Sequence, residues 1–253
     1  MSEQPPAAEH FDQWYSDMGG RSSGDGIKLR LLGLPDRVGA SSLLSWDGLA
    51  EVVEALGLRP GDRFLDLACG RGGYGMEIAA RTGAELVGVD FSAEAIAQAV
   101  ALAHRLGNDC AEFRVGDLAA TGLPDASVDA VVCVDSIQFK PEVATFQEIH
   151  RVLVPGGRLA LTTWEAADRS DERVPERIRA VEVRPALQQA GFVGIEVRDR
   201  PEWLSIERAL WEEAVSLDPG GDPALRSFHD EGVRVLPWLD LSRRVLATAT
   251  ANR

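Results

Sequence analysis

Acidic residues stand at the ends of two short apolar runs, and a glycine turn follows the first run. Asp66 lies in the run Arg63 to Leu67, and the segment Gly70 to Gly75 comes shortly after it. A buried parallel strand that ends in such a turn presents a helix start to a nucleotide-like ligand. Asp90 ends the next apolar run, where a carboxylate can hold two ribose hydroxyls. The sequence therefore predicts a site for a nucleoside-containing ligand.

The turn also fits the dinucleotide pattern G-x-G-x-x-G, so two kinds of ligand compete for it. A nicotinamide dinucleotide would place its diphosphate at the turn, close to the negative charge of Asp66. A ligand that carries an amine and a sulfonium cation tolerates that charge. We therefore favour the sulfonium ligand, and a dehydrogenase is the weaker alternative.

Four segments in one order carry a resemblance to a known family. They are Asp66 to Gly72, Val89 to Ser92, Gly116 to Leu118, and Leu153 to Gly157. On these segments, residues 41–165 resemble the class I S-adenosylmethionine (SAM) dependent methyltransferases, in the broad group that includes the ubiquinone and menaquinone methyltransferases and many small-molecule tailoring enzymes. The resemblance implies an α/β, Rossmann-like sheet of seven strands, mostly parallel with the last strand antiparallel. It also implies N-terminal helices and a helical insertion between strands six and seven.

The resemblance implies SAM as the cofactor and S-adenosylhomocysteine as its product. Asp90 would bind the ribose, Asp117 would accept a hydrogen bond from the adenine amine, and Phe91 would pack on the adenine face. A turn residue is the alternative role for Asp117, and a core aromatic is the alternative for Phe91. The full expected cofactor set is Asp66, Ala68, Gly70, Gly72, Asp90, Phe91, Asp117, Leu118, Asp135 and Ser136.

The end of the fourth apolar run departs from the family pattern. Many tailoring members have one or two histidines where this chain has Gln138 and Phe139, and an amide cannot take a proton near neutral pH. The candidates for a catalytic base are then His229, in the expected insertion, and Glu165, just past the fifth strand. The missing histidine favours an acceptor that is already acidic or nucleophilic. We expect a natural-product or sugar hydroxyl first, an amine nitrogen second and a carbon third.

Aromatic residues concentrate near the N-terminus and in the expected insertion. An apolar pocket for an aromatic, terpenoid or polyketide-like acceptor would explain them, and so would core packing of the added helices. The expected acceptor-binding residues are Trp14, Tyr15, Gln138, Phe139, Trp203, Trp211, Phe228 and Trp238.

Apolar runs and helical patterns alternate from Arg63 onward, which predicts a mostly parallel sheet with helices on both faces. An amphipathic helix is expected before it, over Ser41 to Leu58. We expect residues 1–40 to form a flexible N-terminal segment, whose Gly/Ser-rich stretch at 19–26 could act as a lid. Residues 41–253 would form the methyltransferase domain, with a substrate-cap insertion at about 199–242.

The net charge of −14 disfavours nucleic acid and anionic membranes as partners and leaves a small-molecule substrate. The cysteines lack metal-ligand spacing, so no metal is expected. No signal peptide or membrane-spanning run is visible, and nothing implies disulfides. A cytoplasmic location is therefore expected.

Two further functions stay open on the sequence alone. The fold could hold SAM as a non-reactive element and catalyse a cyclisation or isomerisation, which the altered end of the fourth run allows. Methylated product and S-adenosylhomocysteine would exclude that function. The chain could also be a SAM-binding sensor without enzymatic activity, but its intact glycine turn and ribose acid argue against this.

Overall fold

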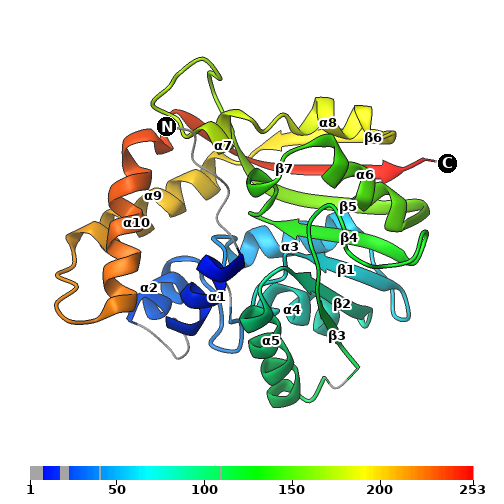
Figure 1. Cartoon of the computed structure of the whole chain (residues 1–253), viewed down its shortest axis with the longest axis horizontal. Coiled ribbons are helices and arrows are strands. Elements are labelled where there is room, and N and C mark those ends of the chain that lie inside the picture. The colour runs from blue at the N-terminus through cyan, green and yellow to red at the C-terminus, as the bar shows by residue number, and fades with distance from the viewer. Residues whose placement is uncertain (1–7, 18–22, 40, 109, 253) are drawn as a thin grey trace.

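A computed structural model describes residues 8–17, 23–39, 41–108 and 110–252. One sheet runs in the order β3-β2-β1-β4-β5-β7-β6, with β7 antiparallel to both of its neighbours and the other pairs parallel (Figure 1). The expected Rossmann-like fold with an antiparallel last strand is confirmed. The strands are β1 (Arg63–Leu67), β2 (Glu85–Asp90), β3 (Glu112–Val115), β4 (Val128–Val134), β5 (Leu153–Ala166), β6 (Phe192–Asp199) and β7 (Ser242–Ala251).

Helices cover both faces of the sheet, and a further group lies beyond the carboxyl ends of its parallel strands (Figure 1). That group consists of α1, α2, α9 and α10. In it, α2 contacts α9 and α10, while α1 contacts α5, which belongs to the sheet layers. The helices are α1 (Ala8–Asp17), α2 (Ser23–Leu31), α3 (Trp46–Leu56), α4 (Gly73–Thr82), α5 (Ala93–Leu106), the short 3-10 helix η1 (Ile137–Phe139), α6 (Val143–Val152), α7 (Glu176–Arg179), α8 (Val183–Gln189), α9 (Pro201–Ser216) and α10 (Pro223–Leu239).

Polar side chains fix several helix starts. Ser45 accepts a hydrogen bond from the Gly48 N–H at 3.1 Å, so the helix expected from Ser41 begins at α3 only after this cap. Ser92 caps α5 and Asp222 caps α10 in the same way. The expected insertion between β6 and β7 is the helical pair α9 and α10, which pack against each other.

Two stretches of the N-terminal region, Ala8–Asp17 and Ser23–Leu31, are helical. Residues 23–26 of the Gly/Ser-rich stretch were expected in a loop, but they form the first turn of α2, and residues 19–22 lie outside the described part. A Cβ on Gly24 would lie 3.4 Å from the Phe228 ring, so α2 begins in direct contact with α10. Tertiary packing of this kind stabilises a helix that its glycine-rich sequence does not favour.

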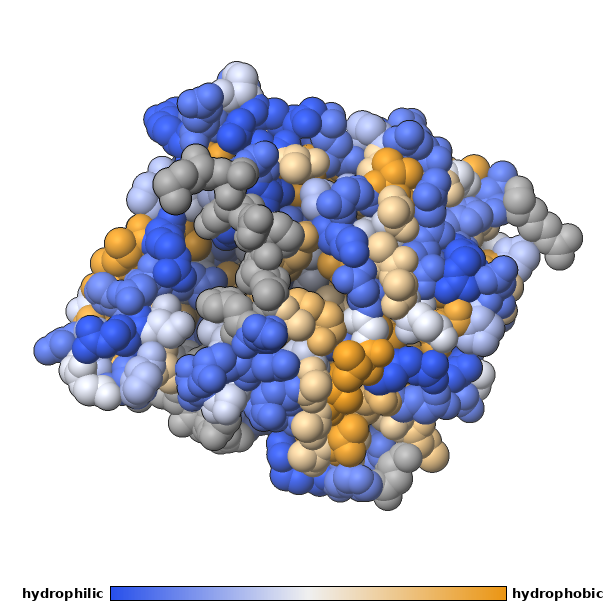
Figure 2. Space-filling model, in the orientation of Figure 1, coloured by the Kyte–Doolittle hydropathy of each residue, from blue (hydrophilic) through white to orange (hydrophobic). Residues whose placement is uncertain are grey.

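Apolar side chains form two buried clusters, one on each face of the sheet. The face of the molecule that Figure 2 shows is mostly hydrophilic, with an apolar strip over α5 and β3. Its elements carry three exposed large hydrophobic residues, Val100, Leu106 and Val115. In the described residues, no helix is long and apolar enough to cross a membrane.

Candidate functional site

The turn after β1 consists largely of residues in the left-handed backbone conformation. Ala68, Gly70 and Gly72 have φ angles of 59°, 51° and 76°, and α4 begins directly after them. A Cβ on Gly70 would lie 2.7 Å from the Tyr15 hydroxyl, so only glycine fits there. The left-handed conformation costs Ala68 roughly 1–2 kcal/mol, and the surrounding fold must impose it. The turn therefore contains a strained residue, Ala68, close to the start of α4.

Asp90 connects this turn to the end of β2. Its Oδ2 accepts a hydrogen bond from the Gly70 N–H at 2.8 Å, and its Oδ1 accepts one from the Ser92 N–H at 3.0 Å. Burial raises the pKa of the carboxyl group, although these backbone donors oppose the rise. Each oxygen keeps a second lone pair, so the carboxylate can still accept from ligand hydroxyls.

Asp66 is the second buried carboxylate beside the turn, with 3% of its surface exposed. A Cβ on Gly75 would lie 2.6 Å from its Oδ2, so the start of α4 packs directly on the acid. Burial first, and then the charge of Asp90, raises the pKa of Asp66 to about 7. Two acids that repel each other inside the fold form a local environment that favours a cationic ligand group.

Asp117 follows β3 and is paired with a lysine. Its Oδ1 accepts hydrogen bonds from Lys140 Nζ at 2.6 Å and from the Ala119 N–H at 2.8 Å. Burial alone would raise the pKa of Asp117, but these donors and the lysine charge lower it below its usual value. Its neighbour Leu118 is half-buried against the core. Lys140 belongs to no recognisable motif, so its pairing with Asp117 could not be predicted from the sequence.

Helix α1 lies against the ends of β2 and β4 and brings a further aromatic ring to them. The Phe11 ring is 5.1 Å from the Phe91 ring and 5.5 Å from the Phe139 ring, between ring centroids. Asp12 accepts hydrogen bonds from the Ser92 Oγ and the Glu94 N–H, at the start of α5. The three phenylalanines therefore form one aromatic group, and only two of them were predicted.

Asp135 lies at the end of β4 with a φ angle of 54° and has protein partners on both oxygens. Arg244 Nη2 and Thr162 Oγ1 each donate to Oδ1 at 2.7 Å, and the Leu43 N–H donates to Oδ2 at 3.1 Å. These bonds favour a structural role for Asp135 over the expected contact with the cofactor. The Ser136 hydroxyl likewise donates a hydrogen bond within the protein, to the Val134 carbonyl at 3.0 Å.

Arg244 of β7 joins Asp135 to the helical insertion. Its side chain is 0% exposed, and its Nη1 donates to Glu207 Oε2 of α9 at 3.0 Å. The indoles of Trp164 and Trp211 donate to the same Glu207 carboxylate, at 2.9 and 3.1 Å. Its two acidic partners lie on distant segments of the chain, so the position of Arg244 could not be predicted from the sequence.

Gln138 and Glu165 are also bound within the protein. The Gln138 amide donates to the Asp135 carbonyl at 2.7 Å and accepts from the Thr163 hydroxyl at 3.2 Å. Glu165 accepts from the Val183 N–H at 2.8 Å and from Arg243 Nη2 at 2.6 Å. Both arrangements favour positioning roles. The two donors that Glu165 already accepts from favour a carboxylate held within the protein over a catalytic base.

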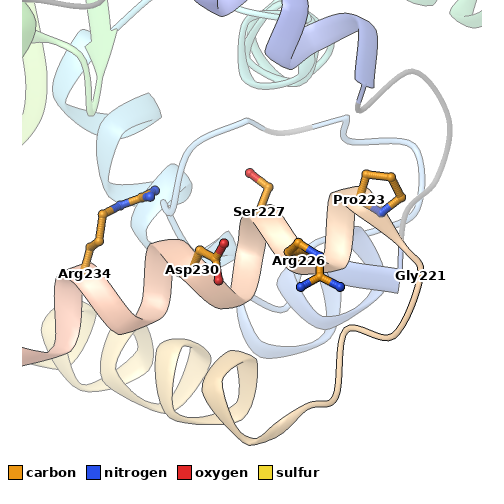
Figure 3. Close-up of a pocket in the computed structure, with 6 residues that line it drawn as sticks. All are labelled: Gly221, Pro223, Arg226, Ser227, Asp230 and Arg234. Atoms are coloured by element: carbon orange, nitrogen blue, oxygen red, sulfur yellow. The ribbon is translucent and has the colours of Figure 1, made fainter.

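His229 lies on α10, beside a shallow pocket on the outer face of that helix. Its Nδ1 is 3.1 Å from Asp230 Oδ1, and Asp230 lines the pocket. Figure 3 shows the lining residues along one side of α10 and its preceding loop, and none of them was expected to bind cofactor or acceptor. They are Gly221, Pro223, Arg226, Ser227, Asp230 and Arg234. This placement favours a surface role for His229 over the expected role as a base.

The aromatic residues of the insertion lie in the core. Trp203, Trp211, Phe228 and Trp238 are all buried and belong to the cluster on one face of the sheet. The Trp211 and Phe228 ring centroids are 5.3 Å apart. Core packing, which the sequence left open, therefore accounts for these four residues.

Tyr15 and Trp14 lie on α1, closer to the turn after β1. Tyr15 is 6% exposed, and its hydroxyl faces the turn, where a Cβ on Gly70 would lie 2.7 Å from it. Burial, with the charge of Asp90 next, raises the Tyr15 pKa far above its usual value. The half-buried Trp14 packs edge-on against Tyr15, with 4.9 Å between centroids.

Among the described residues, no group of three or more histidines, cysteines or acids could hold a metal ion.

Known proteins resemble both the sequence and the fold. Residues 64–157 match the family described as a methyltransferase domain, and this range contains all four segments noted in the sequence. A phosphoethanolamine N-methyltransferase from Triticum aestivum is 28% identical over 225 residues, which cover 82% of this chain and 43% of that protein. The chain thus spans less than half the length of this relative.

Two solved structures share the fold. Phosphoethanolamine N-methyltransferase 2 from Haemonchus contortus, in complex with phosphomonomethylethanolamine and S-adenosylhomocysteine, has a TM-score of 0.75 at 20% identity, covering 91% of this chain and 58% of that one. The cyclase SpnF has a TM-score of 0.71 at 21% identity, covering 100% of this chain and 99% of that one. At these identities the likeness establishes the fold.

Proposed function

We propose, from the premise that this chain carries a class I SAM-dependent methyltransferase domain, that the protein transfers the methyl group of SAM to a small-molecule acceptor. The observation that carries the proposal is the hydrogen bond from the Gly70 N–H to Asp90 Oδ2, at 2.8 Å, which links the turn after β1 to the end of β2. This bond sets a carboxylate and a left-handed glycine turn side by side, as binding of an adenosyl group requires.

The residues around the turn suit the parts of SAM. Asp90 would accept hydrogen bonds from the ribose hydroxyls, and Asp66 would face the positively charged end. The buried pair of acids supports this assignment, because a cation relieves their mutual repulsion. The aromatic group of Phe11, Phe91 and Phe139 would contact the adenine, with Asp117 and Leu118 at its edge. Gly70 and Gly72 would let the backbone approach the methionine part.

SAM supplies an electrophilic methyl group on a sulfonium, so the chain itself must orient an acceptor and exclude water. We propose a hydroxyl oxygen as the methylated atom and an amine nitrogen as the second candidate. The name of the wheat relative, a phosphoethanolamine N-methyltransferase, indicates an amine acceptor for that protein. No histidine was found at the end of β4, where Gln138 donates to a backbone carbonyl. This supports an acceptor whose proton is already acidic.

The deciding experiment is turnover of a panel of phenols, sugars and amines with SAM, read by mass spectrometry. We expect one acceptor class to gain the mass of a methylene group, with one S-adenosylhomocysteine formed per product. Failure of calorimetry to detect SAM binding would overturn the proposal.

A second candidate is a cyclisation or isomerisation that uses bound SAM without consuming it. The likeness to the cyclase SpnF over the full length of both chains supports it. The same panel, extended to polyenes, separates the two functions. A product of unchanged mass with no S-adenosylhomocysteine would favour the second.

A further inference from the structure

Lys140 links the ends of two strands that are not neighbours in the sheet. Its Nζ donates to Asp117 Oδ1 at 2.6 Å, so the segment after β4 is tied to the segment after β3. β2 and β1 lie between those two strands, and they lead into Asp90 and the glycine turn. The ion pair therefore joins segments on either side of the strand ends where the cofactor is proposed to bind.

The backbone is fixed on both sides of this ion pair. The Lys140 N–H donates to the Ile137 carbonyl at 3.1 Å, and the Lys140 carbonyl accepts from the Thr145 hydroxyl at 2.8 Å. On the other segment, the N–H and the carbonyl of Asp117 both bond to Ala120, at 3.1 and 3.0 Å. The lysine side chain and the carboxylate that it contacts are thus both anchored at their bases.

Helix α6 holds the segment after β3 at a second point. Its Glu148, which is buried, accepts hydrogen bonds from the Thr121 N–H at 2.8 Å and from the Thr121 hydroxyl at 2.6 Å. The loop that carries Asp117 is therefore attached at both of its ends to the part of the chain that follows β4.

The donors on Asp117 converge on one of its two oxygens. The Lys140 Nζ and the Ala119 N–H both bond to Oδ1, and among the residues that the structure describes no donor bonds to Oδ2. The terminal torsion of an aspartate is broad, so a carboxylate without such donors would present either oxygen. Burial raises the pKa of Asp117, but the two donors and the lysine charge lower it overall, which keeps the group ionised near neutral pH.

The exposure of the pair indicates what it can contribute. The side chains of Lys140 and Asp117 are 39% and 46% exposed. An ion pair as exposed as this adds little to stability, so its main effect is on the orientation of the carboxylate. The same exposure leaves Oδ2 open to a ligand.

We propose that Lys140 is a positioning residue for recognition of the cofactor base, because it holds Asp117 with Oδ2 free to accept from the 6-amino group of a purine. This inference rests on the proposed function, which places Asp117 and Leu118 at the adenine edge. A 6-amino group donates to such an oxygen, whereas a 6-oxo group offers only lone pairs and is repelled by it. The enzyme would therefore select adenine over hypoxanthine in its cofactor.

The test compares S-adenosylhomocysteine with S-inosylhomocysteine, in which a 6-oxo group replaces the 6-amino group. Calorimetry with the full chain measures both affinities. We expect the wild type to bind the adenosyl compound about tenfold or more tightly, because the inosyl compound loses a hydrogen bond to a charged acceptor. Asp117→Asn can turn its NH2 group to the 6-oxo group and should lose most of this preference.

Three further variants isolate the lysine. Lys140→Met should lower the preference about threefold or more, with an unfolding temperature close to that of the wild type. Lys140→Arg keeps a donor for Asp117 and should retain most of the preference. Arg198→Met removes an exposed cation of β6 and should leave the preference unchanged. In the Asp117→Asn background, Lys140→Met should lower the preference no further, because the two residues act as one unit.

The possible failures can be told apart. A wild type that does not bind S-adenosylhomocysteine contradicts the proposed function and this inference with it. A wild type that binds both compounds equally overturns base recognition by Asp117 and leaves the proposed function standing. An undiminished preference in Lys140→Met, or an equal loss in the Asp117→Asn background, overturns the positioning role of Lys140 alone.

Discussion

Asp90 and Gly70 are joined by a hydrogen bond of 2.8 Å between the carboxylate of one and the backbone N–H of the other. The bond fixes the turn after β1 to the end of β2. The same carboxylate is the proposed ribose ligand, so cofactor binding and turn geometry depend on one side chain.

Asp90→Ala should therefore weaken SAM binding by about 100-fold or more, because two hydrogen bonds to a charged acceptor are lost. Asp90→Asn keeps an oxygen for Gly70 but sets its NH2 group against the Ser92 N–H, so it should lose part of its stability, less than Asp90→Ala, and still bind SAM poorly. Asp199→Ala, on β6, serves as the control with normal affinity. Near-normal SAM affinity of Asp90→Ala in calorimetry would rule out the ribose role.

Asp66 should make stability depend on pH. Its pKa is about 7 in the folded protein against an ordinary value of 3.8, so between these values the folded state binds more protons than the unfolded state. Stability should accordingly fall as pH rises from about 4 to about 7, and change little above that. At about 1.4 kcal/mol per pH unit the loss has an upper limit of about 4 kcal/mol.

Asp66→Asn removes this titration and keeps an oxygen near the Gly75 N–H. The variant should gain stability relative to the wild type at pH 8, with the difference shrinking towards pH 5. Chemical unfolding at the two pH values measures it. A constant difference between the proteins would show that Asp66 does not titrate in this range.

Asp12→Ala should loosen α1, since this side chain holds the helix to Ser92 and Glu94 at the start of α5. We expect faster amide hydrogen exchange in α1 and no change in α9, with a weaker affinity for SAM of several-fold. Asp17→Ala, which loses only an exposed bond to Gln13, is the matched control. Equal exchange rates in the two variants would contradict the anchoring role.

Arg244→Met should destabilise the protein strongly, because it leaves Asp135 and Glu207 buried without their cation. Removal of one partner from a buried ion group typically costs about 3–5 kcal/mol. Arg173→Met breaks only an exposed pair with Asp171 and should change stability by less than about 1 kcal/mol. Urea unfolding compares them, and similar losses for both variants would contradict a central role for Arg244.

The strands along the chain and the glycine turn could be predicted from sequence, because each depends on neighbouring residues. The order β3-β2-β1-β4-β5-β7-β6 was not predicted, and the antiparallel last strand followed only from the family resemblance. Asp66 with its glycine turn is a local signal, whereas the cap at Ser45 was missed, because the helix was expected to begin at Ser41. The class of fold follows from such signals at the right spacing. The placement of Asp90 at a strand end is equally local.

The contacts that complete the site could not be predicted, because they join distant segments. Phe11 of α1 contacts Phe91, and Arg244 of β7 binds Asp135 at the end of β4, so each pair joins residues far apart in the sequence. No spacing in the sequence connects such pairs. Trp203 shows the opposite problem: an aromatic residue on a helix face has the same pattern whether it lines a pocket or packs in the core.

The position of β7 has a consequence for synthesis on the ribosome. β6 pairs only with β7, yet it is made first, and α9 and α10 are made between them. The nascent β6 therefore has no strand to join until β7 emerges and inserts beside β5. Until then the carboxylates of Asp135 and Glu207 also lack the guanidinium of Arg244, so a stalled chain would expose an unpaired sheet edge and two acids that the finished protein keeps from water.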